Sequence, residues 1–159
     1  MVKGQRKKIK SKAKVLVERH ARNVRHIVVA GGCFDILHPG HIRFLKKARS
    51  FGDYLVVFLE PDENIKKLKG KDRPIHNLVD RKQVLSAIKF IDEIITVPKN
   101  ANDEIYKKLV IKIKPQVIVI TNGDPIKNIK LAQAKLVGAR LKIIKKYKSY
   151  SSSAIVNSL

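Results

Sequence analysis

Apolar runs recur along the chain from residue 26 onward and predict a series of buried strands. The segments 26–30 (HIVVA) and 54–59 (YLVVFL) are continuously apolar, which suits strands covered on both faces of a parallel sheet. Shorter runs of the same kind predict three more strands. We expect these at 93–97, 117–121 and 141–144.

Between these runs, apolar residues three or four positions apart predict helices at 39–51, 78–90, 103–113, 126–137 and 151–159. In the second of these, Val84, Leu85 and Ile88 are expected to face inward.

Three residues mark where helices should begin or end. Pro115 is expected to end the helix 103–113, and Gly138 follows 126–137 in the position where a left-handed glycine ends many helices. Ser151 is a suitable N-terminal cap for the last helix.

Strands that alternate with helices predict an α/β fold, here a Rossmann-like, doubly wound, five-stranded parallel sheet. In such sheets, ligands bind beyond the carboxyl ends of the strands, where the strand order reverses. Three segments should therefore carry the chemistry, namely 31–41, 60–70 and 122–125.

A histidine pair follows the first strand within the sequence GGCFDILHPGH, residues 31–41. Gly31 and Gly32 are expected to let the backbone turn and a phosphate approach closely. Pro39 suits the first turn of a helix, whose N-terminus attracts anions. His38 and His41 can donate hydrogen bonds to phosphate oxygens there, so we expect a phosphate site.

Two other uses of this segment are less favoured. A zinc site is not expected, because the sequence offers no third and fourth soft ligand near the histidine pair. A nucleophilic Cys33 would need a partner base, so Cys33 is interpreted as a small buried residue that fills space.

The same segment resembles the GxFDxxHxGH signature of the nucleotidyltransferase superfamily. The similarity continues in family order through LKGKDRPI, DRKQVLSAIKFIDEIITV, IKPQVIVITNGD and YSSSAIV, and covers about residues 26–157. The chain looks most similar to the adenylyltransferase domain that makes ADP-heptose from a heptose 1-phosphate. Glycerol-3-phosphate cytidylyltransferase and the archaeal FAD synthases look like more distant relatives.

The resemblance implies that an acceptor phosphate attacks the α-phosphorus of a nucleoside triphosphate in line, with Mg²⁺ neutralising the pyrophosphate that leaves. It favours AMP transfer from ATP to a small, sugar-like phosphorylated acceptor. A cytidylyltransferase of glycerol phosphate or a similar alcohol phosphate, and an FAD synthase, remain as alternatives. Homodimers are common in the family, so a homodimer is expected.

The resemblance also implies a set of site residues. The catalytic candidates are His38, His41, Lys69 of the LKG stretch, and Arg81, for which the alternative is a salt bridge to Asp80 or Asp72. Lys66, Lys67 and Lys71 are neighbours that could replace Lys69. The nucleotide-binding candidates are Gly32, Cys33, Phe34, Asp35, His38, Gly40, His41, Asn122, Gly123, Asp124, Tyr150, Ser151, Ser152 and Ser153.

The chain departs from the family pattern in three places. Many cytidylyltransferases have an arginine shortly before the serine motif, whereas this chain has only lysines, among them Lys145 and Lys146. A lysine cannot form the two-pronged contact that an arginine forms with a phosphate. Ser149 replaces a family glycine, and Pro125 replaces an aromatic residue, which leaves base and acceptor recognition open.

The charge balance adds a further class of partner. Lys and Arg number 35 against 13 Asp and Glu, for a formal net charge of +22, and such a field attracts polyanions. Residues 1–25 are expected to form a basic extension ahead of a domain at 26–159. A nucleic-acid-binding protein on the same fold is therefore a further alternative, although the intact motifs argue against it.

Composition also bears on the compartment. One cysteine excludes an internal disulfide and fits a cytoplasmic protein. No apolar run is long enough to span a membrane, and the basic N-terminus lacks the apolar stretch of a secretory signal.

Overall fold

The computed structural model describes residues 26–147 and 151–158, and these contain one five-stranded sheet in the order β3-β2-β1-β4-β5. All four pairs of neighbouring strands are parallel, which confirms the predicted Rossmann-like α/β class. The strands are β1 (Ile27–Gly32), β2 (Tyr54–Leu59), β3 (Glu93–Thr96), β4 (Val117–Thr121) and β5 (Arg140–Ile144).

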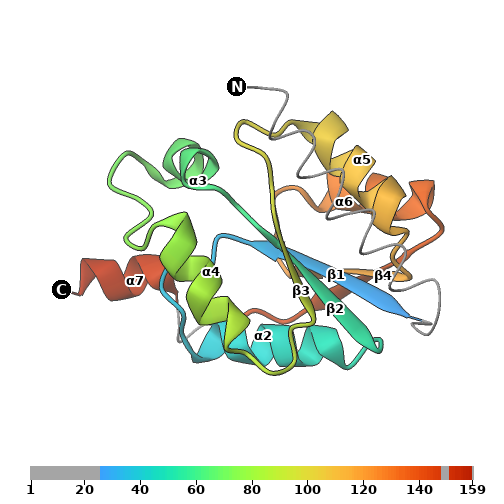
Figure 1. Ribbon diagram of the computed structural model, residues 1–159, viewed down its shortest axis with the longest axis horizontal. Coiled ribbons are helices and arrows are strands. Elements are labelled where there is room, and N and C mark those ends of the chain that lie inside the picture. The colour runs from blue at the N-terminus through green and yellow to red at the C-terminus, as the bar shows by residue number, and fades with distance from the viewer. Residues whose placement is uncertain (1–25, 148–150, 159) are drawn as a thin grey trace.

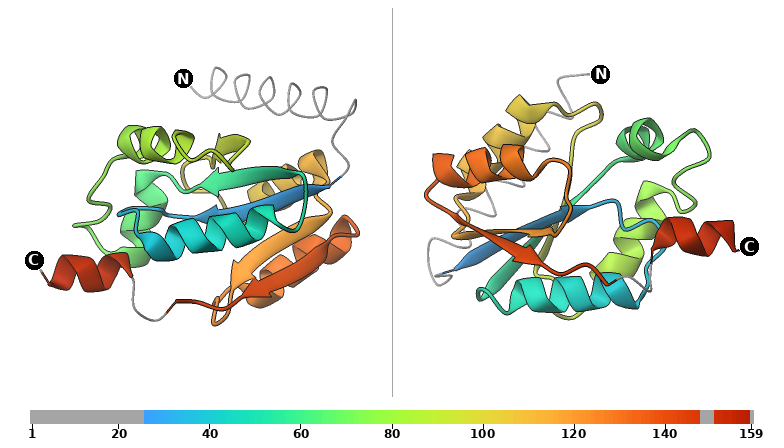
Figure 2. Two further views of the ribbon diagram at one scale, coloured as in Figure 1. Left: turned by 90° about the horizontal axis from the view of Figure 1, so that it is seen from below. Right: turned by 180° about the vertical axis from the view of Figure 1, so that it is seen from behind.

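Helices cover both faces of this sheet (Figures 1 and 2). One face carries α2 (Pro39–Arg49) and α4 (Leu78–Ser86), and the other carries α5 (Asp103–Ile113) and α6 (Lys127–Leu136). The remaining two, α3 (Asp62–Lys69) and α7 (Ser152–Asn157), lie beyond one end of the strands in Figure 1.

Alternate residues of each strand feed the two halves of the core. Val28 and Ala30 of β1 pack against Leu45 of α2, whereas Ile27 and Val29 lie in the cluster that contains Leu109 of α5. This alternation is the period of two that a strand imposes on its side chains. Burial on both faces explains why β1, β2 and β4 are so continuously apolar.

The strand order reverses at β1, which fixes where a ligand should bind. The chain runs from β1 outward through β2 to β3, and then returns to place β4 on the other side of β1. The connections after β1 and after β4 therefore leave the sheet in opposite directions, and a crevice remains between them.

The predicted helix boundaries agree with the structure at three positions. Lys114 takes a left-handed backbone conformation directly after α5 and precedes Pro115. Gly138 has a φ of 69° just beyond α6, as expected for a glycine that ends a helix. The hydroxyl of Ser151 accepts a hydrogen bond from the backbone of Ala154 and so caps α7.

The helix predicted at 78–90 is shorter than expected. It ends at Ser86, and Ile88 packs on the core from the loop that follows. Leu85 is buried as predicted, but the prediction for Val84 was wrong, since its side chain is 45% exposed. The apolar period continues past the helix end because the loop buries its own side chains, so the pattern alone did not reveal the stop.

Helix α3 was not predicted from the sequence. Ile65 is its one buried apolar side chain, because Leu68 is 72% exposed, so the amphipathic period is weak. The charge pattern was the better signal. Asp62 and Glu63 lie in the first turn and lysines in the last, which is the distribution that the helix dipole favours.

Across the part of the chain that the structure describes, none of the helices has the length and apolar character needed to cross a bilayer.

Candidate active site

A cavity of about 830 Å³ opens at the carboxyl ends of β1, β2 and β4, where the strand order predicts a site. Its size suits a nucleotide-sized ligand. Side chains from the loop after β1, from α3, α5 and α6 and from the start of α7 line it. All three segments expected to carry the chemistry contribute to this lining.

The imidazoles of His38 and His41 face this cavity from the N-terminus of α2. Their rings are stacked, with centroids 3.8 Å apart and planes inclined by 21°. The backbone oxygen of His38 accepts from the backbone N–H of His41 at 2.9 Å, so the Pro-Gly between them closes one helical turn. That turn is what brings two residues three positions apart onto one face.

The α2 N-terminus presents a positive field to the cavity. Pro39 occupies its first position, no side-chain hydrogen bond caps it, and its first turn contains no acidic residue. Helix N-termini of this kind attract phosphate groups.

The surroundings keep both histidines neutral. Burial, the neighbouring His38 and the Lys69 charge together lower the pKa of His41 to about 4, although a backbone hydrogen bond with Ile36 opposes them. Burial, Lys146 and Lys69 lower the pKa of His38. The pair therefore lies in a cationic environment that an incoming phosphate would neutralise.

Lys69, the lysine of the LKG stretch, lines the cavity at the end of α3. Its positive charge lowers the pKa of both His38 and His41. Lys67 also lines the cavity, but its ammonium donates to the side chain of Asn100 at 2.7 Å. Lys145 and Lys146, which replace the family arginine, line the same cavity.

The loop after β1 turns at Phe34, not at the glycines as expected. Phe34 has a φ of 45°, whereas Gly31 and Gly32 still belong to β1. Gly32 is needed for space, because a Cβ there would lie 2.9 Å from the Phe34 ring. That ring in turn lies against His41, with centroids 5.2 Å apart, so Gly32 lets Phe34 support the histidine.

The segment after β4 lines the cavity as the resemblance implies. Gly123 has a φ of 77°, and a Cβ there would have open space around it, so the backbone is accessible. Asn122 accepts a hydrogen bond from the backbone of Lys146. The carboxylate of Asp124 accepts from the backbone of Ile126 at 2.9 Å, so one of its oxygens supports the entry into α6.

The three serines at the start of α7 differ in their surroundings. All three line the cavity, but Ser152 is buried and Ser153 is exposed. The hydroxyl of Ser152 accepts from the guanidinium of Arg73 at 3.1 Å. Tyr150, also predicted to contact the nucleotide, lies outside the described residues.

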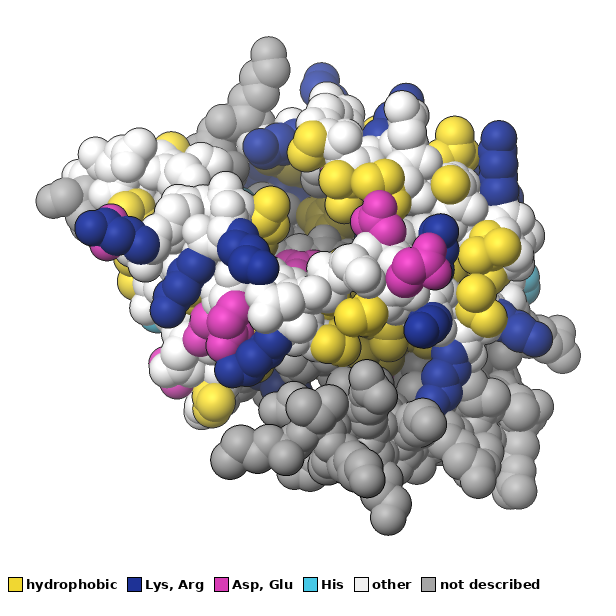
Figure 3. All heavy atoms as spheres, turned by 90° about the horizontal axis from the view of Figure 1, so that it is seen from above, with side chains coloured by type: hydrophobic (Ala, Val, Ile, Leu, Met, Phe, Trp, Pro, Cys, Tyr) yellow, Lys and Arg dark blue, Asp and Glu magenta, His cyan; other side chains and the backbone are white. Residues whose placement is uncertain are grey.

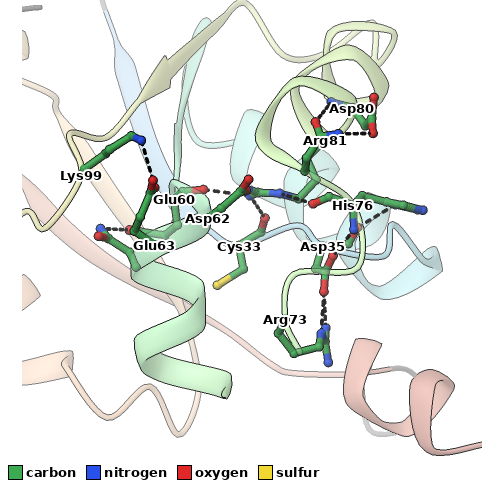
Figure 4. A network of polar contacts seen from close by, with 12 residues as sticks. Cys33, Asp35, Glu60, Asp62, Glu63, Arg73, His76, Asp80, Arg81 and Lys99 are labelled. Atoms are coloured by element: carbon green, nitrogen blue, oxygen red, sulfur yellow. Dashed lines mark hydrogen bonds and ion pairs between the residues drawn. The ribbon is translucent and has the colours of Figure 1, made fainter. Parts of the chain in front are cut away.

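Asp35 does not line the cavity and is part of a buried support. Its carboxylate accepts from Arg73 Nε at 2.6 Å and from the backbone of His76 at 3.0 Å (Figure 4). Burial alone would raise the pKa of Asp35, but these hydrogen bonds and the Arg73 charge together lower it. Arg73 thus joins the loop after β1 to α7, a role that the sequence did not reveal.

Arg81 also lies elsewhere than expected. Its side chain is fully buried, and its guanidinium donates to the backbone oxygens of Cys33 and Glu60 at 2.6 and 2.8 Å. It pairs with Asp62 at 2.6 Å, not with Asp80 or Asp72 (Figure 4). The anion that an arginine near a helix start requires is therefore supplied by α3, and Arg81 holds the ends of β1 and β2 together.

Cys33 lines the cavity as a protonated thiol. Burial raises its pKa, and Glu60 and Asp35 raise it further against the opposing charges of Lys69 and Arg81. A raised pKa leaves little thiolate at neutral pH, which favours the space-filling interpretation over a nucleophile.

A second polar wall of the cavity was missed from the sequence. It combines Glu60 at the end of β2 with four side chains from three helices. The four side chains are Asn64 of α3, Tyr106 of α5, and Lys130 and Gln133 of α6. Gln133 interrupts the buried face of α6, and such a lone polar residue among apolar positions was the available signal.

Among the described residues, no group of three His, Cys, Asp or Glu side chains could hold a metal ion. A protein cage is not what Mg²⁺ needs here, because it is usually bound by one or two carboxylates together with substrate phosphates. Asp124, Asp103 and Glu60 are the carboxylates that line the cavity. The cavity thus fits a magnesium ion that enters with a triphosphate.

Comparison with known proteins finds relatives over most of the chain. The model of the cytidylyltransferase-like family matches residues 29–158. The chain is 37% identical over 135 residues to the bifunctional protein HldE of Campylobacter curvus, a match that covers 79% of this chain and 28% of that protein. The chain therefore spans less than a third of the length of this curated relative.

Solved structures agree with this result. The lipopolysaccharide core biosynthesis protein of Thermoplasma volcanium is 31% identical, with a TM-score of 0.61 over 79% of this chain and 98% of that one. Pantoate–beta-alanine ligase of Francisella tularensis has a TM-score of 0.64 at 15% identity, over 92% of this chain and 74% of that one. The second likeness concerns the fold alone.

Proposed function

The chain belongs to the cytidylyltransferase-like family, and we propose that it is a nucleotidyltransferase that transfers AMP from ATP to a small, sugar-like phosphorylated acceptor. Pyrophosphate is the second product. The similarity to HldE and to a lipopolysaccharide core biosynthesis protein supports an acceptor of the sugar phosphate type.

One observation carries the proposal, namely the stacked pair of His38 and His41 at the N-terminus of α2, facing a nucleotide-sized cavity. Lys69 lowers the pKa of both histidines and Lys146 lowers that of His38. Both lysines line the cavity, where their charges would attract a polyphosphate. Neutral imidazoles donate hydrogen bonds without carrying a permanent charge. They can therefore follow the charge that builds on the phosphate oxygens in the transition state.

The reaction is a direct displacement. An oxygen of the acceptor phosphate attacks the α-phosphorus of ATP, the new P–O bond forms, and the bond to the bridging oxygen of pyrophosphate breaks. His38 and His41 donate to the phosphate oxygens, and Lys69 offsets their charge. No covalent bond to the protein is needed, because positioning and electrostatics lower the barrier.

Enzymes of this family generally use a divalent metal ion with the nucleoside triphosphate, and we propose Mg²⁺ for this chain. When bound, it would neutralise the pyrophosphate that leaves. Asp124 is the carboxylate at the β4 end of the cavity that could reach such an ion through water.

The base that is bound decides between the alternatives. ATP is favoured by the HldE similarity, whereas CTP would indicate a cytidylyltransferase of glycerol phosphate or a similar alcohol phosphate. FAD synthesis would require FMN as acceptor. A homodimer and a separate basic extension at residues 1–25 complete the proposal, and sedimentation analysis and removal of the extension test these two points.

The test is equilibrium binding of ATP and of CTP, each with Mg²⁺, to the wild type and to His41→Ala. We expect tight binding of ATP that weakens at least tenfold in the variant, since one charge-assisted hydrogen bond contributes about 1.5–3 kcal/mol. Release of pyrophosphate when a heptose 1-phosphate is added to the wild type would complete the assignment.

His26→Ala is the matched control, because His26 is exposed at the opposite end of β1. Tighter binding of CTP than of ATP would reverse the preference for AMP transfer. Binding of neither nucleotide would overturn the proposed function. It would favour the alternative of a nucleic-acid-binding protein, for which the net charge of +22 is the supporting feature. Basic side chains are spread over the face drawn in Figure 3, and nucleic-acid binding through them would weaken steeply with salt.

A further inference from the structure

One part of the second polar wall, at Glu60, α3 and α5, is held by hydrogen bonds among its own side chains. The carboxylate of Glu60 accepts from the Tyr106 hydroxyl and from the Asn64 amide, the latter at 2.9 Å. The Asn64 carbonyl in turn accepts from the backbone of Asn100 at 2.9 Å. Because these side chains hold one another, the carboxylate of Glu60 is fixed in its place at the cavity.

Lys130 brings a positive charge to this carboxylate from α6. Its ammonium lies 4.7 Å from the centre of the Tyr106 ring. Burial lowers the pKa of Lys130, whereas Glu60, Asp124 and Asp103 raise it. Lys130 and Glu60 therefore line the same cavity and interact electrostatically.

Gln133 lies one helical turn beyond Lys130 and lines the same cavity. Its side chain is 1% exposed, and its Oε1 atom is buried with no hydrogen-bond partner among the described residues. Leaving such an acceptor unpaired costs about 1–3 kcal/mol. The cost is recovered if a bound ligand donates to it.

We propose that Gln133, Lys130 and Glu60 form the subsite that recognises the hydroxyl groups of a polyhydroxylated acceptor phosphate. The proposal rests on the proposed function and names the residues that select its acceptor. Gln133 Oε1 accepts from one hydroxyl, and the fixed carboxylate of Glu60 accepts from another. Lys130 donates to a hydroxyl oxygen between them.

The chemistry of this wall favours a sugar over a nucleobase. Glu60 and Gln133 offer acceptors and Lys130 offers an ammonium in the same cavity. Hydroxyl groups match this set because each hydroxyl can donate one hydrogen bond and accept two. An adenine carries both of its amino N–H donors on one nitrogen atom, whereas the hydroxyls of a sugar are spread around its ring and can reach acceptors on different elements. The accessible backbone at Gly123, on the far side of β1 from Glu60, is left for the nucleoside.

The experiment measures AMP transfer by pyrophosphate release, with saturating ATP and a varied heptose 1-phosphate, in the wild type, Gln133→Leu and Lys130→Met. ATP affinity is measured in parallel. We expect the acceptor KM to rise about tenfold in Gln133→Leu, since one hydrogen bond of about 1.4 kcal/mol corresponds to that factor. The ATP dissociation constant should change less than twofold.

A second acceptor sharpens the test. Glycerol 3-phosphate has fewer hydroxyls, so the wild type should favour heptose 1-phosphate in kcat/KM. Gln133→Leu should reduce that preference about tenfold, because a site with buried polar groups discriminates against partners that leave them unpaired. A purely structural role of Gln133 would lower both rates alike.

The controls are Gln83→Leu on α4 and Lys135→Met on α6, which change the same residue types at exposed positions. Thermal unfolding verifies that each variant folds. If the wild type turns over heptose 1-phosphate and Gln133→Leu keeps its KM, this inference alone is overturned. A loss of ATP affinity with unchanged acceptor KM would assign the wall to the nucleoside instead. A wild type that binds ATP but releases no pyrophosphate would overturn the proposed function and this inference together.

Discussion

The imidazole ring of His38 stacks on that of His41 with the centroids 3.8 Å apart. Two protonated rings at this separation would repel each other, and burial already opposes a charge on His41. The pair is therefore neutral in the free protein at neutral pH. A triphosphate brings the opposite charge and would raise the pKa of both rings, so nucleotide binding and proton uptake should be linked.

The depressed pKa of His41 predicts a loss of stability on mild acidification. The unfolded chain binds protons at its histidines near pH 6.5, whereas folded His41 resists protonation until about pH 4. The unfolded state therefore holds more protons between these values, and the free energy of unfolding must fall as pH falls through this window. The full difference corresponds to about 3 kcal/mol.

Urea unfolding at pH 7, 6 and 5 tests this expectation before the carboxylates titrate. His41→Asn should flatten the decline in the unfolding free energy, and His26→Asn should leave it as in the wild type because His26 is exposed. Equal slopes for the wild type and His41→Asn would mean that the histidine pair is not the cause. Below about pH 4 a further decline is expected from Asp35, whose pKa is lowered.

Lys69→Met should raise the pKa of both histidines. The Lys69 charge lowers the pKa of His38 and of His41, and methionine keeps most of the side-chain volume without the charge. NMR titration of the imidazole nitrogens measures the change directly. Lys66→Met is the control on the same helix, since Lys66 does not contribute to either pKa. The same titration values in both variants would remove Lys69 from the electrostatics of the site.

Much of this arrangement followed from the sequence, because strand burial and a long motif are local signals. Continuous apolar runs identified β1, β2 and β4, and the motif placed His38 and His41 at the phosphate end. The supports of the site were not predictable in the same way. Apart from the His76 backbone, which is five residues from Arg81, the partners of the Arg73 and Arg81 side chains lie 19–79 residues away in the chain, and no local pattern encodes such distances.

The resemblance assigned Asp35 and Arg81 to substrate contacts, whereas in the structure both side chains contact other groups of the protein. Asp35 lies within the motif, Arg81 contacts the backbone of Cys33 in the motif, and both side chains are buried, so either a phosphate or a protein partner could satisfy their charges. Here the protein satisfies them, through Arg73 and Asp62. The partner of Arg81 lies on α3, which was not predicted, and the partners of Asp35 lie in the loop that follows α3.

Ser152 and Ser153 should respond differently to replacement by alanine. Ser152→Ala removes an acceptor from the buried Arg73 guanidinium and should cost about 1–3 kcal/mol of unfolding free energy. Ser153 is exposed and lines the cavity, so Ser153→Ala should weaken ATP binding severalfold and leave stability unchanged. Urea unfolding and ATP titration of both variants separate the two roles. The opposite assignment would follow if only Ser152→Ala weakened binding.

Arg81→Lys should destabilise the fold although the charge is kept. The guanidinium contacts three backbone oxygens and Asp62 at once, and a lysine cannot reproduce this fork. We expect a loss of about 2–4 kcal/mol in urea unfolding, since buried hydrogen-bonding groups would remain unpaired. Lys89→Arg, at an exposed position, should be neutral. A variant as stable as the wild type but unable to bind ATP would instead support a substrate contact by Arg81.

The Cys33 thiol should not be needed for AMP transfer, but its rate of alkylation should depend on whether a ligand fills the cavity. Burial raises the pKa of its thiol, and thiolate is the reactive form. Alkylation by iodoacetamide at pH 7 should therefore be at least tenfold slower than that of free cysteine, and ATP with Mg²⁺ should slow it further because Cys33 lines the cavity. Cys33→Ala should keep AMP transfer within a few fold of the wild type. A complete loss of transfer in a folded Cys33→Ala protein would show that the thiol takes part in the reaction. It would also contradict the direct displacement inferred from the histidine pair, because a thiol has no step to perform in that scheme.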